Sequence, residues 1–345
     1  MTGETSPSRG QLTKMAETLA RPRSLFLLPE PPVSLNLPTT FRHPVGDKAA
    51  TVPANVRLHI RSARRIQRAV GWALADAAPI DLPPRSSKQP SEEVADALRA
   101  WVGISVEEQV SWTSEYRALN AWRAALEDRG LLTFQFEMRG QSIRGFSAWD
   151  AHAPMIAVNS HNQTPQARIF TFAHELAHLA TRTDAACLDW VAPRERGSRS
   201  LEGWCDAVAA QFLMPAEDVR KFARSTLGVV EPKTGGLPAG RRLSHRYRVS
   251  LGASVLRLIE LDLAPRSLYG EAAALARNVR RKAASGGASE PRPAKRVRQY
   301  GRRATKSLLE ATSTGRVSER DAADMLAVDY RELSAIAAAL STAVE

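Results

Sequence analysis

The sequence predicts an α+β protein, in which a small sheet leads into one long helix and further helices lie before and after them. Two observations support this fold class. Short β-prone segments cluster between residues 131 and 158, and apolar residues recur at helical spacing on both sides of them. The chain has 345 residues, of which 43% are hydrophobic and 24% charged. This length and composition fit a globular protein of two or three domains, or one large domain with appendages.

Helices are predicted before the sheet from apolar spacing and capping residues. Residues 12–19 have helical spacing, and Pro29–Pro32 ends this helix in an extended segment. A second break is predicted at 86–90. Three further helices are expected, spanning residues 91–100, starting at 105, and spanning 114–129.

The predicted sheet has three strands. Residues 131–138 alternate between apolar and polar types, 143–146 follow after Arg139-Gly140, and 155–158 are short and apolar. We expect a meander, in which these strands pair in the order of the sequence. It leads into a helix over 166–181, and further helices are predicted at about 202–213 and 216–224.

The helix predicted at 166–181 carries the pattern H-E-x-x-H. His174 and His178 are four residues apart, so both lie on one helix face and can bind one ion. Glu175 projects about 100° away from His174 and can reach a metal-bound water without being a ligand. Apolar residues surround the three, and burying them without a purpose would be costly. The pattern therefore predicts a zinc site with Glu175 as the base.

A catalytic zinc ion takes a third protein ligand and keeps one position open. Glu202, 24 residues after His178, opens a predicted helix and is the best candidate. Asp206 lies one turn later and can hold the far nitrogen of a ligating histidine. Cys205 could instead face the metal, but we interpret it as a small buried residue. The chain has two cysteines, which excludes a disulfide scaffold and a zinc site built on several cysteines.

The H-E-x-x-H helix is typical of metallopeptidases, which also stabilise the oxyanion of a tetrahedral intermediate. His161 and His245 are the candidate side chains for this role. Arg168 is expected to brace the fold or a carboxylate, and Asn159 to cap the loop before the helix.

The positive charge is concentrated in one tract. The chain carries a net charge of +12, and residues 266–306 contribute ten of these charges. Gly, Ser and Pro residues in the middle of the tract are typical of a flexible linker. Such a segment can contact DNA phosphates without sequence preference, or be a solvated tether. The candidate nucleic-acid-binding residues are Lys295, Arg296, Arg298, Arg302 and Arg303.

The residues around the histidines resemble the ImmA/IrrE family of zinc metallopeptidases. The matching positions are Arg168, Phe172, His174, Glu175, His178, Glu202, Ala209 and Leu213–Pro215. Cys205-Asp206 replaces the usual Ala-Asn, and Val208 stands where Phe is frequent. The resemblance implies a zincin-like core, Zn²⁺ as cofactor, and cleavage of a helix-turn-helix repressor that switches on stress-response or mobile-element genes.

The resemblance extends beyond this core and implies a long family member with the N-terminal helix-turn-helix domain largely missing from this sequence. About 20 residues precede Arg21 where such a domain needs about 55–60, so either this member has lost the domain or the true start lies upstream. Six parts are expected: a tail with the remnant of that domain (1–50), a helical lead-in (51–130), the metallopeptidase core (131–230), a helix-turn-helix-like segment (231–282), a basic flexible linker (283–298) and a C-terminal helical segment (299–345).

Two other function classes remain open: a DNA-binding regulator that keeps the peptidase fold, and an antitoxin-like protein that holds a partner without cutting it. An intact Glu175 favours the peptidase, because a binding protein does not need the base. The polar first 24 residues and the lack of an apolar run of about 20 residues predict a cytoplasmic protein.

Overall fold

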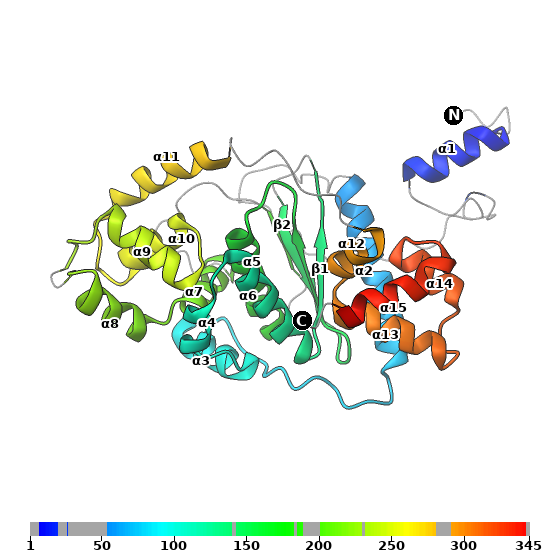
Figure 1. Cartoon of the computed structure of the whole chain (residues 1–345), viewed down its shortest axis with the longest axis horizontal. Coiled ribbons are helices and arrows are strands. Elements are labelled where there is room, and N and C mark those ends of the chain that lie inside the picture. Colours follow the sequence, from blue (N-terminus) through cyan, green and yellow to red (C-terminus); the bar gives the residue numbers. More distant parts are fainter. Residues whose placement is uncertain are drawn as a thin grey trace.

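The computed structural model describes residues 7–19, 26, 54–139, 143–182, 185–188, 201–229, 232–280 and 291–342. It has an α+β architecture, as predicted, with helices on both faces of a small sheet (Figure 1). The elements are α1 (Arg9–Leu19), α2 (Ala54–Ala73), α3 (Ser91–Val102), α4 (Val106–Ser111), α5 (Glu115–Asp128), β1 (Leu132–Phe136), β2 (Ile143–Ala148), β3 (Met155–Asn159), α6 (Pro165–Ala180), β4 (Ala185–Leu188), α7 (Leu201–Leu213), α8 (Ala216–Thr226), α9 (Leu237–Tyr247), α10 (Leu251–Glu260), α11 (Leu268–Arg280), α12 (Arg292–Tyr300), α13 (Arg302–Ser313), α14 (Glu319–Leu326), η2 (Tyr330–Glu332) and α15 (Leu333–Thr342).

The capping residues explain where the predicted helices begin. The hydroxyls of Ser105, Ser114 and Thr164 accept hydrogen bonds from the first free backbone N–H groups of α4, α5 and α6. Gly130, with φ +100°, follows α5 in the left-handed region. These helices are confirmed, as is the helix at 12–19. The expected extended segment at 29–32 lies outside the described residues, and no feature here tests the domain boundaries.

The predicted meander is wrong, because β3 lies between β1 and β2. The strand order is β1-β3-β2-β4, with β1 and β3 parallel and the other pairs antiparallel. Asn159 fixes this arrangement where β3 ends. Its side-chain amide donates to the carbonyls of Met138 and Ile143, while its carbonyl oxygen accepts from Met138 N. The segment after β1 is therefore bound to the end of β3 and does not form a tight hairpin into β2.

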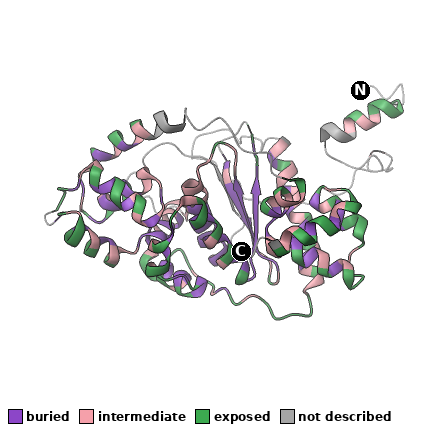
Figure 2. Cartoon of the chain, viewed as in Figure 1, coloured by how far each residue is buried: buried purple, intermediate pink, exposed green. Residues whose placement is uncertain are grey.

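Both faces of the sheet are covered, and the described residues of β1 and β3 are buried throughout (Figure 2). Phe134, Phe136 and Phe146 pack on one face against α2, α12 and α13. Because side chains alternate along a strand, Thr133 and Gln135 point to the other face, towards α5 and α6. There Gln135 accepts from Arg168 at 2.9 Å, so each buried polar residue of β1 is paired. Such burial on two sides is typical of parallel pairing.

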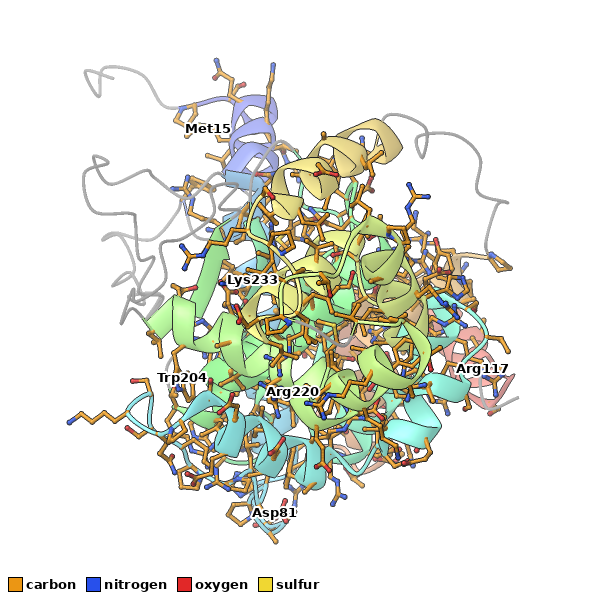
Figure 3. The ribbon with its side chains drawn as sticks, turned by 90° about the vertical axis from the view of Figure 1, so that its left-hand side faces the viewer. Met15, Asp81, Arg117, Trp204, Arg220 and Lys233 are labelled. Carbon is orange, nitrogen blue, oxygen red and sulfur yellow. The ribbon has the colours of Figure 1, made fainter. Side chains whose placement is uncertain are left out.

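Helix α7 is held by side chains from three other helices. The last carbonyls of a helix have no partner within it. Arg99 of α3 donates to Phe212 O at 2.6 Å, Gln109 of α4 to Leu213 O at 3.0 Å, and Arg257 of α10 to Met214 O at 3.0 Å. At the other end, Trp204 donates to Gln89 O at 2.9 Å; Figure 3 shows Trp204 on the side that faces the viewer. The first turn of α7 is thereby fixed in place.

The predicted flexible linker at 283–298 is wrong from residue 292 onward, because Arg292–Tyr300 forms helix α12. Val297 and Tyr300 lie three residues apart and are buried, and Tyr300 packs edge-on against Phe134 and Phe136 of the sheet. Two apolar contacts thus outweigh a composition that favours solvation. Residues 281–290 lie outside the described part of the chain.

A buried charged network attaches this C-terminal part to α5 and β1. The Glu127 carboxylate accepts from the backbone N–H groups of Arg302 and Arg303 at 3.1 and 3.3 Å, at the start of α13. It also accepts from the Thr133 hydroxyl and forms an ion pair with Arg123 at 3.3 Å.

None of the helices in the described residues has the length and apolar composition of a membrane span.

Candidate metal centre

Helix α6 places its two histidines beside the start of α7. Thr164 caps α6, Pro165 occupies its first turn, and nearly all residues from Ile169 to Ala180 are buried. A helix that is apolar on most sides packs in the core, which leaves the histidines no orientation towards solvent. His174 and His178 face Glu202, which lies in the first turn of α7 and is about one quarter exposed.

The three side chains have the spacing of tetrahedral zinc ligands. The Nε2 atoms of His174 and His178 are 3.2 Å apart, and each lies 3.4 Å from an oxygen of Glu202. With Zn–N and Zn–O distances of about 2.0–2.1 Å, tetrahedral ligand atoms are about 3.3–3.4 Å apart. Among the described residues, these three form the group that can hold a metal ion. The identity of the metal stays a prediction.

The charges around this group also suit a cation. Asp206 lies one turn after Glu202, and its Oδ1 is 2.8 Å from Nδ1 of His174. Burial would lower the pKa of His174, but Asp206 and Glu202 outweigh it and raise this pKa to about 10. Burial would raise the pKa of Glu202, but the two histidines hold it well below its ordinary value. A divalent ion would balance these clustered carboxylates, and the donor set therefore fits zinc.

Glu175 is fully buried next to this group. Its Oε2 accepts a hydrogen bond of 2.6 Å from the hydroxyl of Ser147 on β2. Its other oxygen, Oε1, is buried and has no hydrogen-bond partner in the described part of the chain. The carboxylate is thus held at one oxygen and open at the other.

Cys205 is buried, as we expected, and it is not part of the metal group. Its pKa is raised by burial and by the nearby Glu202, Glu175 and Asp206 carboxylates, so the thiol stays protonated. The side chain of Cys187 lies outside the described part of β4.

The structure brings neither candidate oxyanion stabiliser into the metal group. His161 lies on the loop after β3, and its Nδ1 is 3.4 Å from Oε1 of Glu137, which follows β1. His245 lies on α9, in a hollow of about 430 Å³, with Nδ1 3.2 Å from Arg248 Nη1. Both histidines thus contact side chains outside the group. Arg168, in contrast, braces the fold through Gln135, as expected.

The candidate nucleic-acid-binding residues divide into two sets. Lys295 and Arg298 are exposed. Arg296 instead donates to Ala327 O at 3.0 Å, where α14 ends, and Arg302 and Arg303 are half-buried beside Glu127. The Arg296 side chain thus connects α12 to the end of α14, whereas Arg302 and Arg303 bind Glu127 through their backbone N–H groups.

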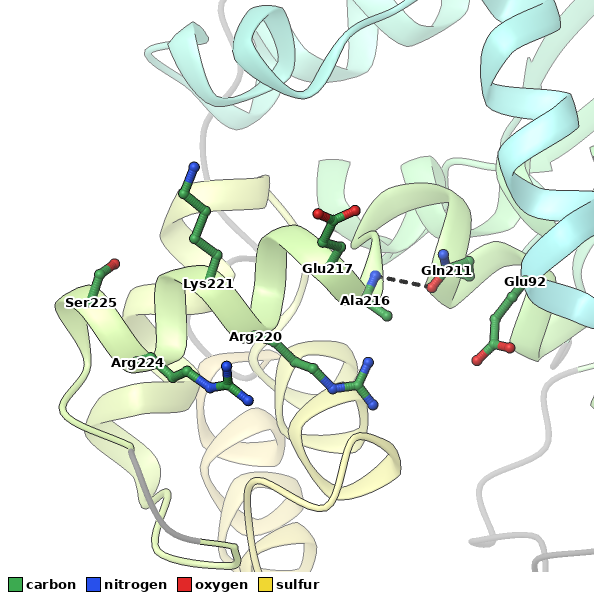
Figure 4. A pocket seen from close by; sticks show the side chains of 8 residues that line it. All are labelled: Glu92, Gln211, Ala216, Glu217, Arg220, Lys221, Arg224 and Ser225. Atoms are coloured by element: carbon green, nitrogen blue, oxygen red, sulfur yellow. Dashed lines mark hydrogen bonds between the residues drawn. The ribbon is translucent and has the colours of Figure 1, made fainter.

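A larger hollow, of about 1080 Å³, lies along α8 and not at the histidines. Figure 4 shows Arg220 and Arg224 extending from α8 in the same direction. The residues that line it are Glu92, Gln211, Ala216, Glu217, Arg220, Lys221, Arg224 and Ser225. None of them belongs to the metal group, so the donor atoms, and not the size of a hollow, locate the site.

Gly145 and Ser147 are not among the site residues predicted from the sequence. They lie two residues apart on β2 and face α6, where Ser147 contacts Glu175. The available signal was this spacing, because residues i and i+2 of a strand share a face. It became informative only once the pairing of β2 was known.

The comparisons agree with this geometry. Residues 126–258 match the family model Peptidase_M78, described as the IrrE N-terminal-like domain. Comparison of the chain with curated proteins gives no match. The matched segment contains the sheet, α6 and α7, and with them His174, His178 and Glu202. Residues 126–258 are therefore a Peptidase_M78 domain of the ImmA/IrrE family, with a zincin-like fold.

Proposed function

We propose that this protein is a zinc-dependent endopeptidase. The observation that supports it best is the group of His174, His178 and Glu202, in which the two Nε2 atoms lie 3.2 Å apart and each is 3.4 Å from one of the two carboxylate oxygens, with a buried glutamate beside them. When bound, zinc would polarise the scissile carbonyl group and lower the pKa of a water molecule. His174, His178 and Glu202 would hold the ion.

Asp206 orients one of the ligands, and Glu175 transfers protons. Asp206 accepts a hydrogen bond from Nδ1 of His174 and thereby directs Nε2 towards the ion. Glu175 takes the proton of the attacking water and passes it to the leaving amine, as a general base and then a general acid. The burial of α6 keeps these groups in one orientation.

The substrate is proposed from the resemblance to the ImmA/IrrE family, which implies a partner repressor. We infer that the protein cleaves a helix-turn-helix transcriptional repressor in the cytoplasm and so derepresses stress-response or mobile-element genes. A repressor encoded by a neighbouring gene would be the first candidate to test.

The test uses the full chain, purified without chelator. Metal analysis should give about one zinc per chain, and fluorescein-labelled casein and the candidate repressor should be cleaved. Glu175→Gln preserves the shape of the side chain and removes the base, so zinc should remain and cleavage should fall at least a hundredfold.

Two further variants separate the ligands from other histidines. His174→Ala should lose zinc, while His245→Ala, outside the metal group, should keep it. Equal zinc in both would overturn the ligand assignment. Zinc with no cleavage by the wild type would favour the non-cleaving regulator or the antitoxin-like protein.

Contact between the basic tract and DNA stays a proposal. Lys295 and Arg298 are the residues to change, because both are exposed, whereas the Arg296 side chain contacts Ala327 O and Arg302 and Arg303 are half-buried. If the tract binds phosphates, Lys295→Gln with Arg298→Gln should weaken DNA binding and reduce its dependence on salt. Unchanged affinity would remove DNA from the partners.

A further inference from the structure

Strand β2 presents two residues to the side chain of Glu175. Gly145 and Ser147 face α6, and both lie outside the metal group. Ser147 is fully buried, and its hydroxyl donates to Oε2 of Glu175 at 2.6 Å. A bond of this length between a hydroxyl and a carboxylate is short, as expected for a charge-assisted contact.

Because Gly145 has no side chain, the Glu175 carboxylate fits beside β2. A Cβ atom at this position would be 3.2 Å from Oε1 of Glu175. It would also be 2.6 Å from Cγ2 of Thr171 and 2.8 Å from the carbonyl oxygen of Ala157. At such distances the new Cβ would overlap these atoms, so the strand or its neighbours would have to move. Strand β2 thus packs closely against Oε1 of Glu175 at Gly145 and donates a hydrogen bond to Oε2 from Ser147.

The remaining oxygen has no donor in the part of the chain that the structure describes. Oε1 of Glu175 is buried and unpaired within the described residues. An unpaired buried acceptor destabilises the fold, and more so when it is charged. Such an atom calls for an explanation, and here it belongs to the base of the proposed peptidase.

We propose that Ser147 is a positioning residue for Glu175. Its hydroxyl occupies Oε2, so that Oε1 is the oxygen that takes the proton of the attacking water. The O–H bond of water breaks, an O–H bond forms at Oε1, and that proton later moves to the nitrogen of the leaving amine, while Ser147 keeps its own proton. This inference rests on the proposed peptidase function and deepens it.

The test compares two serines in the full chain. Ser147→Ala removes the hydroxyl that contacts Glu175. Ser254→Ala is the matched control, since Ser254 of α10 is also fully buried and donates to Gly240 O at 2.8 Å. Each change removes one buried hydroxyl donor, and the two should cost a similar amount of stability.

Kinetics with labelled casein separate positioning from stability. If Ser147 positions the base, Ser147→Ala should lower kcat per bound zinc about 10–100-fold, with KM unchanged. The kcat per bound zinc of Ser254→Ala should stay within twofold of the wild-type value. Values of kcat per bound zinc within twofold for both variants would mean that Ser147 only stabilises the fold, and would overturn the proposal.

A second readout needs neither metal nor turnover. In metal-free protein with ¹³C-labelled glutamate carboxyl groups, the Glu175 resonance is identified by its loss in Glu175→Gln. Ser147→Ala should shift this resonance, and Ser254→Ala should not. An unshifted resonance overturns the positioning role even if the wild type cleaves nothing, whereas zinc binding without cleavage by the wild type overturns the proposed function separately.

Discussion

Removal of the Glu127 carboxylate should detach the C-terminal helices from the sheet. Glu127 and Arg123 are paired at a spacing of four residues and are only 6% and 9% exposed. Burial lowers the pKa of Arg123, and Glu127 counteracts this. In Glu127→Ala the Arg123 charge stays buried without its partner, which typically costs 3–5 kcal/mol. The N–H groups of Arg302 and Arg303 lose their acceptor as well.

We expect Glu127→Ala to lower the free energy of unfolding by about 4 kcal/mol, roughly a thousandfold in the unfolding constant. The assay is urea unfolding followed by circular dichroism. Glu310→Ala is the matched control, because Glu310 and Lys306 have the same spacing at 3.7 Å but are 61% and 72% exposed. Its effect should stay below about 0.5 kcal/mol. A loss below about 1 kcal/mol in Glu127→Ala would refute the reasoning.

Three other changes test the site. Asp206→Asn should weaken zinc affinity about 10–100-fold, measured by competition with a chelating dye; unchanged affinity would contradict the contact with His174. Because Asp206 and Glu202 raise the pKa of His174 to about 10, metal-free His174 is protonated at pH 7, and zinc must displace that proton. Affinity should therefore rise with pH, and calorimetry in two buffers should show proton release; no release would reject this. Gly145→Ala should lower the free energy of unfolding in urea by about 1–3 kcal/mol, because the new Cβ would lie 2.6 Å from Cγ2 of Thr171. An unchanged free energy of unfolding would show that β2 can shift to accommodate the methyl group.

The candidate metal ligands could be predicted because helical spacing brings their side chains to one side. His174 and His178 share a helix face in any α-helix, and Glu202 follows at the start of the next one. The contact between Asp206 and His174 follows from the same helical geometry. Ser147 carries no such signal, since its role depends on which face of β2 meets α6.

The strand order could not be predicted from local patterns. Alternation in β1 indicates a strand, but its parallel pairing with β3 depends on helices that cover both faces from distant parts of the chain. The composition around Lys295 predicted a linker for the same reason. Only the sheet surface that receives Val297 and Tyr300 makes residues 292–300 a helix.

The two faces of the sheet have consequences for folding order. The core around α6 and α7 contains buried residues from Leu82 to Ala272, whereas the opposite core needs α2 and residues from Val297 to Ile336. During synthesis the half with the candidate metal group can therefore consolidate first, while the face with Phe134, Phe136 and Phe146 still lacks α12 and α13, which are made later. A fragment limited to residues 126–258 would keep this aromatic face bare, and we expect it to aggregate.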